Sequence, residues 1–459
     1  MAISVRATKS SSGGGSRARR YANGKALRGQ VPRSAHALWT PSKDRPDPLE
    51  LLQDSNAHRL PALVPIRYGR MSLSAFAFLR GAAGVMAHDL STTPTTGLRT
   101  QLCGDAHLSN FGIFGTPERD QVFDVNDFDE TLPGPWEWDV KRLATSLVVA
   151  GRQNRFSPVV NRKAARMAVR AYRERMSRFA RERYLDTWYA HLDLAHLGGG
   201  VKRVGRKWMD RAVKKARQRT GFNAFPKMVK LVNGRYRIRE QPPLIVHYTN
   251  PSHDEESRAF FDRYLATLPD ERRTLLDRYH IVDVAQKVVG VGSVGTACSV
   301  LLLMADRDVE DPLFLQLKQA SSSALEPYLG ASPYANHAQR VVVGQHLMQE
   351  ASDIFLGWSS VRSDDFYVRQ LRDMKFASDV TTLGPKALIG QAALCGTALA
   401  RAHARTGDPA SISGYLGEKT VFDEAIADFA EAYANQTERD YRLLLVAIRN
   451  GRIVAQSDV

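Results

Sequence analysis

The spacing of hydrophobic and polar residues predicts amphipathic helices along much of the chain. In these stretches apolar residues recur every three to four positions, the period of a helix that buries one face. The predicted helical stretches are Leu73–Leu90, Trp138–Gly151, Val160–Arg183, Gly205–Thr220, His337–Asp353 and most of the chain after Gly384.

Short apolar runs bounded by turn residues predict strands in two places. The first is Leu98–Asp129, where QLCGDAHLSNFGIF and QVFDVNDFDE are joined across the turn GTPERD. The second begins near Tyr279, and its strand candidates are Ile281–Val289, Ala297–Met304, Pro312–Lys318 and the runs IFLGWSS and DFYVRQL. Runs of this length between Gly, Pro and Asp residues are typical of short strands. The alternation of helical and antiparallel β stretches predicts an α+β fold.

Composition narrows the class of protein. Of the 459 residues, 43% are hydrophobic and 24% are charged, which is typical of globular chains and not of disordered or fibrous ones. Three widely separated cysteines (Cys103, Cys298 and Cys395) argue against a disulfide scaffold or a zinc module. No uncharged apolar run approaches the roughly 18–20 residues of a membrane helix, and the basic N-terminus lacks the apolar centre of a secretory signal. We therefore expect a soluble, cytoplasmic protein that does not bind membranes.

Positive charge is concentrated in two segments. The formal net charge is +16, residues 1–46 carry ten Lys or Arg against Asp44, and residues 201–240 carry fourteen against two acids. Residues 1–30 are rich in Ser, Gly and Arg, so we expect a disordered basic tail and arm over 1–46. Clustered Lys and Arg can bind nucleic acid by releasing counterions from phosphates. A solubilising tail and a solvated helix face explain the charge more simply, and we favour that interpretation.

The densest group of chemically active residue types is Asp105-Ala-His107-Leu-Ser-Asn110, followed seventeen residues later by Asp127-Phe-Asp129. Carboxylates and an amide oxygen suit Mg²⁺, which prefers oxygen ligands and shares them with substrate phosphates. Protein kinases divide the work in this way among a catalytic Asp, an Asn of the same loop and a later metal-binding Asp. Asp105 and His107 are candidate catalytic residues, although His107 could instead orient the loop. Asn110, Asp127 and Asp129 are candidate Mg²⁺ ligands, with turn formation and capping as the alternative role.

A glycine motif, Gly290-Val-Gly292-Ser293-Val-Gly295, lies between two strand candidates. A dinucleotide-binding unit would need a helix after the glycines, but here a β-branched and apolar run follows them. Strand, glycines and strand is the arrangement of the kinase glycine-rich loop, whose backbone covers nucleotide phosphates. The four residues are therefore candidate nucleotide-binding positions.

Lys318 ends the next apolar strand, 23 residues after Gly295. With the glycine motif ahead of it, we interpret Lys318 as a Lys that pairs with phosphates; the alternative is an ordinary Lys that reaches solvent from a strand end. Its acidic partner would be Glu326, which is near in sequence, or Glu350, which lies in the following helix. The sequence does not separate these two candidates.

The order of these parts differs from that of a kinase. A kinase runs from glycine loop to Lys, catalytic loop and metal-binding Asp, whereas here the catalytic loop comes first. A circular permutation explains the order and is compatible with folding. We predict a two-lobed protein-kinase-like fold, with a small antiparallel β lobe inserted late in a mainly helical large lobe. The predicted divisions are the basic tail (1–46), a large lobe with the catalytic loop and metal-binding segment (47–280), a small ATP-binding lobe (281–380) and C-terminal helices returning to the large lobe (381–459).

Three parts of the chain resemble the bacterial domain-of-unknown-function 2252 family. They are LVPIRYGRMSLSAFAFLRGAAGVMAHDL, QLCGDAHLSNFGIF with FDVNDFDETLPGPWEWDVKRLATSLVVAGR, and KVVGVGSVGT with FLQLKQASSSALEPY. The likeness extends from about Val31 to Asp440, and the family name implies no activity.

More distantly, GDAHLSN is similar to the GDxHxxN loop of aminoglycoside phosphotransferases and choline kinases, and NDFDE to their metal-binding segment. That resemblance implies ATP and Mg²⁺ as cofactors. The residues to which it assigns roles are Asp105 (base), Asn110 and Asp127 (Mg²⁺ ligands), Lys318 (phosphate) and Asp139 (brace of the catalytic loop).

The combined expectation is an ATP- and Mg²⁺-dependent phosphotransferase acting on a hydroxyl of an unidentified small molecule or protein. The alternatives are transfer of AMP, a nucleotide-binding pseudokinase and a metallophosphoesterase. The intact Asp and Asn set argues against a pseudokinase, and the absence of further His ligands argues against a phosphoesterase. For Arg67, Arg70 and Arg80 we favour bracing of a loop carboxylate over contact with phosphate.

Overall fold

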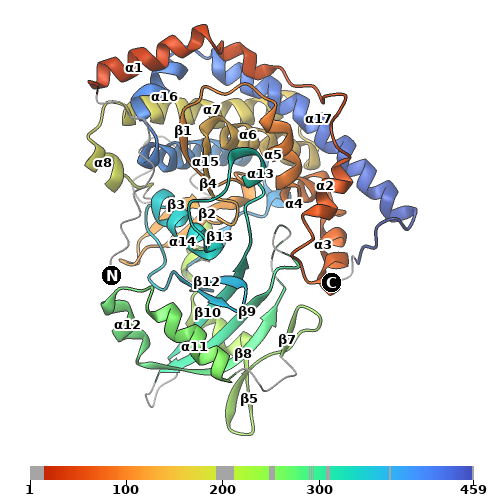
Figure 1. Cartoon of the computed structure of the whole chain (residues 1–459), viewed down its shortest axis with the longest axis vertical. Helices are drawn as coiled ribbons and strands as arrows, with labels where there is room; N and C mark the ends of the chain where they lie inside the picture. Colours follow the sequence, from red (N-terminus) through yellow and green to blue (C-terminus); the bar gives the residue numbers. More distant parts are fainter. Residues whose placement is uncertain are drawn as a thin grey trace.

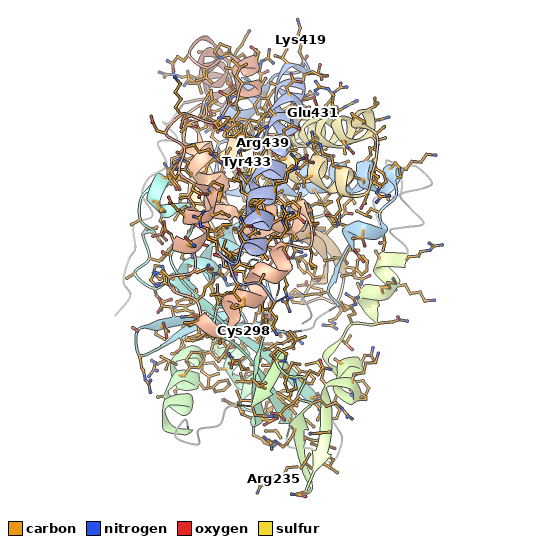
Figure 2. All side chains as sticks on the ribbon, turned by 90° about the vertical axis from the view of Figure 1, so that its right-hand side faces the viewer. Arg235, Cys298, Lys419, Glu431, Tyr433 and Arg439 are labelled. Carbon is orange, nitrogen blue, oxygen red and sulfur yellow. The ribbon has the colours of Figure 1, made fainter. Side chains whose placement is uncertain are left out.

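The structure is a computed structural model that describes residues 15–192, 211–247, 254–288, 290, 292, 294–305, 311–371 and 374–456. Helices gather at one end of the molecule and a large antiparallel sheet lies toward the other (Figure 1). In the view turned by 90°, Lys419 marks the helical end, Arg235 the opposite end, and Cys298 lies between them (Figure 2). The expected α+β class is confirmed.

The helical body is built around α6 (Trp136–Gln153), which is buried along nearly its whole length. Helix α7 (Pro158–Phe179) packs on α6 and on α15 (Pro385–Thr406). Its start is set locally, because the Ser157 side chain accepts a hydrogen bond from the Val160 N–H and Pro158 occupies the first turn. The other α-helices of this body are α1 (Arg17–Ala26), α2 (Pro48–Asp54), α3 (Val64–Met71), α4 (Ala75–Gly81), α5 (Ala83–Ser91), α8 (Tyr184–Tyr189), α16 (Pro409–Leu416) and α17 (Val421–Arg449).

The large sheet has six antiparallel strands in the order β11-β12-β10-β9-β8-β7. The strands are β7 (Ile245–His247), β8 (Tyr279–Lys287), β9 (Cys298–Ala305), β10 (Pro312–Ala320), β11 (Gly357–Val361) and β12 (Asp364–Gln370). The glycine motif connects the neighbours β8 and β9. After β10 the chain passes through α13 (Glu326–Leu329) and α14 (His337–Met348) and returns at the edge, so β12 fits between β11 and β10.

Strand β9 is buried at every position because both faces of the sheet are covered. Successive side chains of a strand point to opposite faces. Leu301 belongs to a hydrophobic core shared with α11 (Asp254–Leu265), and Leu302 to a separate core shared with α10 (Gly221–Met228). The remaining named elements at this end are α12 (Asp270–Leu276), β5 (Val229–Val232) and β6 (Arg235–Ile238).

Two smaller groups of strands lie between the helical body and the large sheet (Figure 1). The members are the pair β1 (Arg99–Leu102) and β4 (Leu132–Pro135), and the three-stranded sheet of β13 (Phe376–Ala377), β2 (Phe111–Gly115) and β3 (Gln121–Val125). The candidate catalytic loop leaves the end of β1, and the candidate metal-binding segment leaves the end of β3. Their side chains therefore meet where the two halves of the molecule face each other.

Most of the predicted elements are confirmed. The strand candidates after Tyr279 overlap β8 to β12, and the two runs around GTPERD contain the hairpin β2–β3. The stretch Leu73–Leu90 is wrong as a single helix, because Ala82 leaves helical backbone angles (φ −113°, ψ 40°) between α4 and α5. Of the predicted helix Gly205–Thr220, residues 211–217 are helical, and 205–210 lie outside the described residues.

Disorder over residues 1–46 is wrong for residues 15–46, whereas residues 1–14 lie outside the described part. Helix α1 packs on α16 through a close backbone approach, since a Cβ at Gly24 would stand 1.9 Å from the Ser411 carbonyl oxygen. Arg28 donates to the Tyr415 carbonyl at 2.9 Å and Arg33 to the Leu416 carbonyl at 2.6 Å, at the end of α16. Backbone contact and capping order this segment, and a prediction based on apolar content misses both.

The elements around the large sheet begin before residue 281. Helix α10 packs on β10, β7 pairs with β8, and α11 contacts β11. The predicted division at 280/281 therefore falls inside this group of elements. Polar, charged residues dominate the segment before β8, so its two helices and short edge strand give a weak sequence signal.

Candidate functional site

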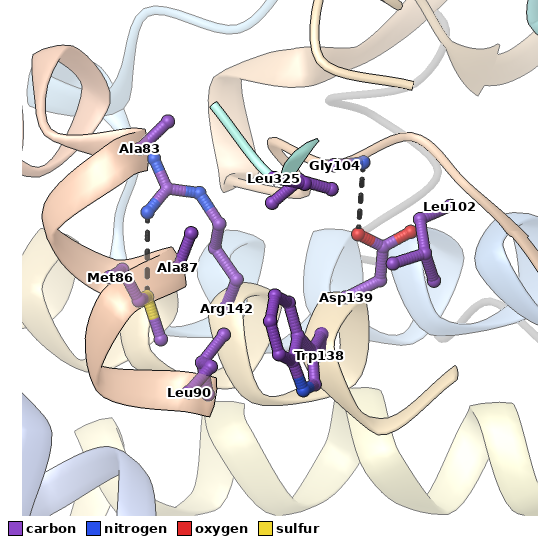
Figure 3. Close-up of a pocket in the computed structure, with 10 residues that line it drawn as sticks. All are labelled: Ala83, Met86, Ala87, Leu90, Leu102, Gly104, Trp138, Asp139, Arg142 and Leu325. Atoms are coloured by element: carbon purple, nitrogen blue, oxygen red, sulfur yellow. Dashed lines mark hydrogen bonds between the residues drawn. The ribbon is translucent and has the colours of Figure 1, made fainter. Parts of the chain in front are cut away.

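The loop after β1 has a backbone held from two directions. Gly104 has a positive φ of 79°, and a Cβ there would stand 2.2 Å from the Glu130 carbonyl oxygen, so glycine is required. From α6, the Asp139 carboxylate accepts hydrogen bonds from the Cys103 N–H at 2.8 Å and the Gly104 N–H at 3.1 Å. The predicted bracing role of Asp139 is confirmed. Figure 3 shows the bond from Gly104.

Asp139 is itself held by His403 of α15, whose Nε2 lies 3.2 Å from its carboxylate. The other ring nitrogen of His403 lies 2.9 Å from the Tyr172 hydroxyl of α7. All three side chains are buried. A chain of hydrogen bonds thus joins three helices of the body to the backbone of the loop.

Asn110 ties the loop to the segment after β3. Its side-chain amide donates to the Asp105 carbonyl at 3.0 Å and to the Asp127 carbonyl at 2.9 Å. These two bonds use the amide nitrogen and leave Oδ1 buried without a hydrogen-bond partner. Asn110 therefore joins the backbones of the two acidic positions, a role that differs from the metal ligation that the sequence led us to expect of it.

Asp105 forms an ion pair with Arg142, whose Nε donates to Oδ1 at 2.5 Å. Arg142 is held in turn by the Leu79 carbonyl at 2.9 Å and the Met86 sulfur at 3.4 Å, the latter visible in Figure 3. Burial raises the pKa of Asp105, and Arg142 counteracts that rise. Arg142 therefore holds the Asp105 carboxylate, and sequence reasoning did not find this partner.

His107 lies beside Asp105, with its Nε2 3.5 Å from Oδ2, and its ring meets Phe76 edge-on at 6.3 Å. Burial lowers the pKa of His107 well below its usual value, and Arg80 and Arg142 lower it further, so its ring is neutral near pH 7. Its Nδ1 has no hydrogen-bond partner. His107 is near the site, but the short contact to Asp105 belongs to Arg142.

Lys318 meets the predicted metal-binding segment. Its ammonium group donates to Asp129 and lies 3.5 Å from Oδ1 of Asp127, and Asp129 also accepts a bond from the Tyr367 hydroxyl at 2.8 Å. Burial disfavours charge on Lys318, but Asp127 and Asp129 raise its pKa above the usual value. Burial and then Asp129 raise the pKa of Asp127, whereas Lys318 outweighs burial and lowers the pKa of Asp129. Lys318 is therefore a cation between two carboxylates.

The structure brings neither predicted acidic partner to Lys318. Glu326 accepts from the Ser323 N–H at 2.9 Å and lies 3.8 Å from Arg340. Glu350 lies 3.8 Å from Arg401, in the helical body. Asp129, and not Glu326 or Glu350, is the acidic partner of Lys318, because the segment after β3 lies next to β10, the strand that carries Lys318.

The glycine motif reaches the same place. Gly292 lines the cleft described below, and Arg80 Nη2 lies 3.9 Å from where a Cβ would stand at Gly290. Gly295 has a positive φ of 96° and packs against the Arg59 side chain. Ser293 lies outside the described residues.

One cleft collects several of these groups, although His107 and Lys318 are not among the residues that line it. The space in it that a water-sized probe can enter is about 60 Å³, which is well below the roughly 300–1,000 Å³ of typical small-molecule sites. Its lining residues are Ser55, Arg59, Arg67, Arg80, Gly81, Ala83, Gly84, Asp105, Asn110, Asp127, Asp129, Glu130, Gly292 and Ala324. Arg67 and Arg80, for which we favoured a carboxylate-bracing role, line the cleft, but Arg142 braces Asp105.

All three cysteines are buried and free, as expected for small apolar side chains. In the part of the chain that the structure describes, no helix has both the length and the apolar composition needed to cross a bilayer.

Comparison with known proteins identifies one family. No curated protein and no solved structure matches the chain. Residues 59–447 match the family model described as "Uncharacterized protein conserved in bacteria (DUF2252)", which spans most of the chain and all of the cleft except Ser55. The chain therefore belongs to this DUF2252 family.

Proposed function

We propose that this protein is an ATP- and Mg²⁺-dependent phosphotransferase with a kinase-like, circularly permuted fold. The observation that carries the proposal is a cleft lined by Asp105, Asn110, Asp127, Asp129 and Gly292, with Lys318 paired to Asp129. Segments almost two hundred residues apart supply an Asp, an Asn, a later Asp and a Lys, which are among the groups that kinases use for phosphoryl transfer, although Asp129 and not a Glu pairs with the Lys.

The strand order supports the proposal. Two antiparallel neighbours, β8 and β9, are joined by the glycine motif, and the next strand, β10, carries Lys318. A helix, α14, and two further strands follow. Glycine loop, Lys strand, helix and further strands is the order of parts in the ATP-binding lobe of kinases.

The residues present fit a magnesium ion held jointly with phosphates. Within the described ranges no three His, Cys, Asp or Glu side chains are grouped to hold a metal ion. However, Oδ1 of Asn110 and Oδ1 of Asp127 are buried and lack hydrogen-bond partners. Mg²⁺ takes few protein ligands when substrate phosphates and waters complete its shell. Asn110 and Asp127 would hold it, with Asp129 adjacent, and Mg²⁺ would supply neutralisation of phosphate charge.

In the proposed reaction the acceptor oxygen forms a bond to the γ-phosphorus of ATP. The bond from that phosphorus to the bridging oxygen breaks, ADP leaves with the electron pair, and Asp105 takes the hydroxyl proton. Arg142 would keep Asp105 oriented and favour its ionised form before that transfer. Lys318 and the backbone near Gly292 lie where they can bind the phosphates.

The proposal is tested by thermal-shift titration with ATP and MgCl₂ on the wild type, Asp127→Ala and Lys318→Met. Arg263→Gln is the matched control, because Arg263 lies on α11, which does not line the cleft, and donates to the Ser360 carbonyl of β11. A ligand specific for the folded state stabilises it by about 2.7 kcal/mol at a hundredfold excess over Kd. We expect a Mg²⁺-dependent shift in the wild type and control that both cleft variants lose. No shift with any nucleotide in the folded wild type would overturn the proposal.

Asp105→Asn separates binding from chemistry. It should retain the ATP shift and lose transfer by roughly 10²–10⁴-fold, because general-base catalysis contributes about that much. Product analysis of wild-type turnover decides what is transferred: ADP supports phosphoryl transfer, whereas pyrophosphate would show transfer of AMP and contradict the proposed reaction.

A further inference from the structure

Three arginines of the N-terminal segment form one wall of the cleft. Arg59 precedes α3, Arg67 lies within α3, and Arg80 lies near the end of α4. Asp105 and Asp127 lie close enough to Arg80 to affect its charge. The wall therefore faces the reacting side of the cleft.

None of these arginines forms an ion pair with a carboxylate in the described ranges. Arg59 donates to the Val294 carbonyl at 2.5 Å and the Ser55 carbonyl at 3.0 Å. Arg67 donates to the Gly81 carbonyl at 2.8 Å, to the Leu52 carbonyl at 3.4 Å and to the Asn56 side-chain oxygen. The Nε atoms of Arg67 and Arg80 are buried without a hydrogen-bond partner.

The carboxylates of the cleft already have partners of their own. Asp105 is paired with Arg142 and Asp129 with Lys318. Glu130 accepts a hydrogen bond from the Ala324 N–H at 2.6 Å, and burial raises its pKa. No ion pair in the described ranges joins Arg59, Arg67 or Arg80 to these carboxylates, although Glu130 lies close enough to Arg59 and Arg67, and Asp105 and Asp127 to Arg80, to favour the charged guanidinium.

Cations enclosed by protein without a carboxylate partner are costly for a folded protein; of the three, Arg67 is fully buried, whereas Arg59 and Arg80 are partly exposed. Burial lowers the pKa of Arg59, Arg67 and Arg80. A guanidinium keeps five N–H donors in a planar fork that matches phosphate and carboxylate oxygens. Charges held in this state fit a bound anion that completes their hydrogen bonds.

The position of Arg80 places that anion beside the transferred group. Its Nη2 lies 3.9 Å from where a Cβ would stand at Gly290, and its charge is felt by Asp105. The anion would thus lie between the proposed base and the glycine motif, where the acceptor must approach.

The same segment closes this side of the cleft. The Leu60 N–H donates to the Gly295 carbonyl at 2.7 Å, and Ile66 shares a small hydrophobic core with Val288 and Val294. A polypeptide acceptor that entered from this side would have to displace these contacts to reach Asp105, whereas a small acceptor has less of the segment to move. The closure favours a small acceptor.

We infer that the acceptor is a small molecule bearing an anionic group, phosphate or carboxylate, which Arg59, Arg67 and Arg80 bind. That the anion belongs to an acceptor rests on the proposed phosphotransferase function. The anion site itself can be tested without that proposal.

Inorganic phosphate is the probe. Its Kd is measured by calorimetry on the wild type, Arg80→Gln, Arg59→Gln and Lys318→Gln, first alone and then with saturating ADP and MgCl₂. We expect Arg80→Gln and Arg59→Gln each to weaken phosphate binding at least tenfold, and Lys318→Gln to change it less than threefold. Phosphate should bind equally well when ADP and Mg²⁺ are present. Arg80 donates no hydrogen bond in the described structure, so Arg80→Gln should fold, and circular dichroism checks this.

Other results overturn parts of the inference separately. Absent phosphate binding, or binding unchanged by both Arg substitutions, removes the anion site. Phosphate that competes with β,γ-imido-ATP but not with ADP assigns the arginines to the γ-phosphate and overturns the acceptor assignment. Phosphate binding through Arg80 in a protein that binds no nucleotide would keep the anion site and sink the phosphotransferase proposal.

Discussion

Arg45 and Arg80 are both largely enclosed by protein, yet their surroundings differ. Arg45 donates to Asp89 at 2.7 and 2.8 Å and to Asp440 at 3.1 and 2.7 Å, linking the N-terminal arm to α5 and α17. The two carboxylates accept further bonds from Tyr433 and Gln436. In the described ranges Arg80 in the cleft forms no ion pair with a carboxylate, and its Nε has no hydrogen-bond partner.

The difference separates a structural charge from one available to a ligand. Burial disfavours charge on Arg45, but its bonds to Asp89 and Asp440 outweigh that and raise its pKa above the usual value. Burial lowers the pKa of Arg80, and Asp105 and Asp127 offset only part of that effect. A hydrogen-bond network in which every donor and acceptor has a partner stabilises the fold. A network with unused donors can be completed by a bound ligand. Stability measurements on matched variants can test this contrast.

The largest effect is expected for Arg45→Met. The substitution keeps an apolar side chain in place but leaves Asp89 and Asp440 buried without their cation. Breaking a buried pair from one side costs about 3–5 kcal/mol. Urea unfolding should show that loss in the free energy of unfolding at pH 7, and a loss below about 1 kcal/mol would contradict the structural role.

Lys318→Met should cost less, about 2–3 kcal/mol in the presence of EDTA, because Asp127 and Asp129 are partly exposed. The substitution leaves two neighbouring carboxylates without their cation. If these residues bind Mg²⁺, added MgCl₂ should restore part of the stability, while CaCl₂ at equal ionic strength reports the response to a divalent charge alone. Arg45→Met is the control, since MgCl₂ should not restore it. Equal responses of the two variants to MgCl₂ would argue against a metal site.

His36 tests whether the helical body excludes a charge that lacks a partner. It is fully buried, lies 2.8 Å from the Tyr415 hydroxyl, and burial, with a further contribution from Lys141, lowers its pKa to about 3. Between pH 6.5 and 3 the unfolded chain therefore binds a proton that the folded chain does not. Stability is fully present above pH 6.5 and falls as the pH is lowered through that window.

For His36 alone the loss between pH 7 and pH 5 is about 2 kcal/mol. His36→Gln should remove that part of the pH dependence. The measurement is urea unfolding of both proteins at the two pH values. The change in the free energy of unfolding between pH 7 and pH 5 is compared for the two proteins, and the difference isolates His36 from other buried histidines such as His107. An identical pH dependence of the free energy of unfolding in both proteins would show that His36 takes up a proton in the folded state as easily as in the unfolded state.

Sequence reasoning located the residues whose signal is local. The motif from Asp105 to Asn110 and the segment Asp127–Asp129 combine unusual residue types at fixed spacing, and the glycine motif lies between recognisable strands. Lys318 could be predicted because it ends an apolar run just after those glycines. The α+β class followed from the periodicity, which does not depend on distant contacts.

The partners of these residues could not be predicted in the same way. Lys318 and Asp129 are 189 positions apart in the sequence. Arg142, which pairs with Asp105, lies in a helix whose sequence pattern is that of an ordinary core helix. The arginines of the wall belong to no sequence motif. Nothing in the sequence distinguishes them from the other residues among the 64 Lys and Arg, because only the folded structure shows which of these side chains are enclosed. Which charges stay unpaired is decided by the fold as a whole.

The smallest effect on stability is expected for Arg80→Met, and it is the most informative. Because Arg80 has no ion pair to lose, removing its charge should change the free energy of unfolding by less than about 1 kcal/mol, and the change can be favourable since a buried cation is removed. Urea unfolding at pH 7 should therefore show Arg80→Met near the wild type and Arg45→Met far below it, although both replace a largely enclosed Arg by Met. Added inorganic phosphate should then stabilise the wild type and Arg45→Met but not Arg80→Met. A large loss for Arg80→Met without phosphate would mean that Arg80 already completes its interactions within the chain, and the contrast between the two arginines would fail.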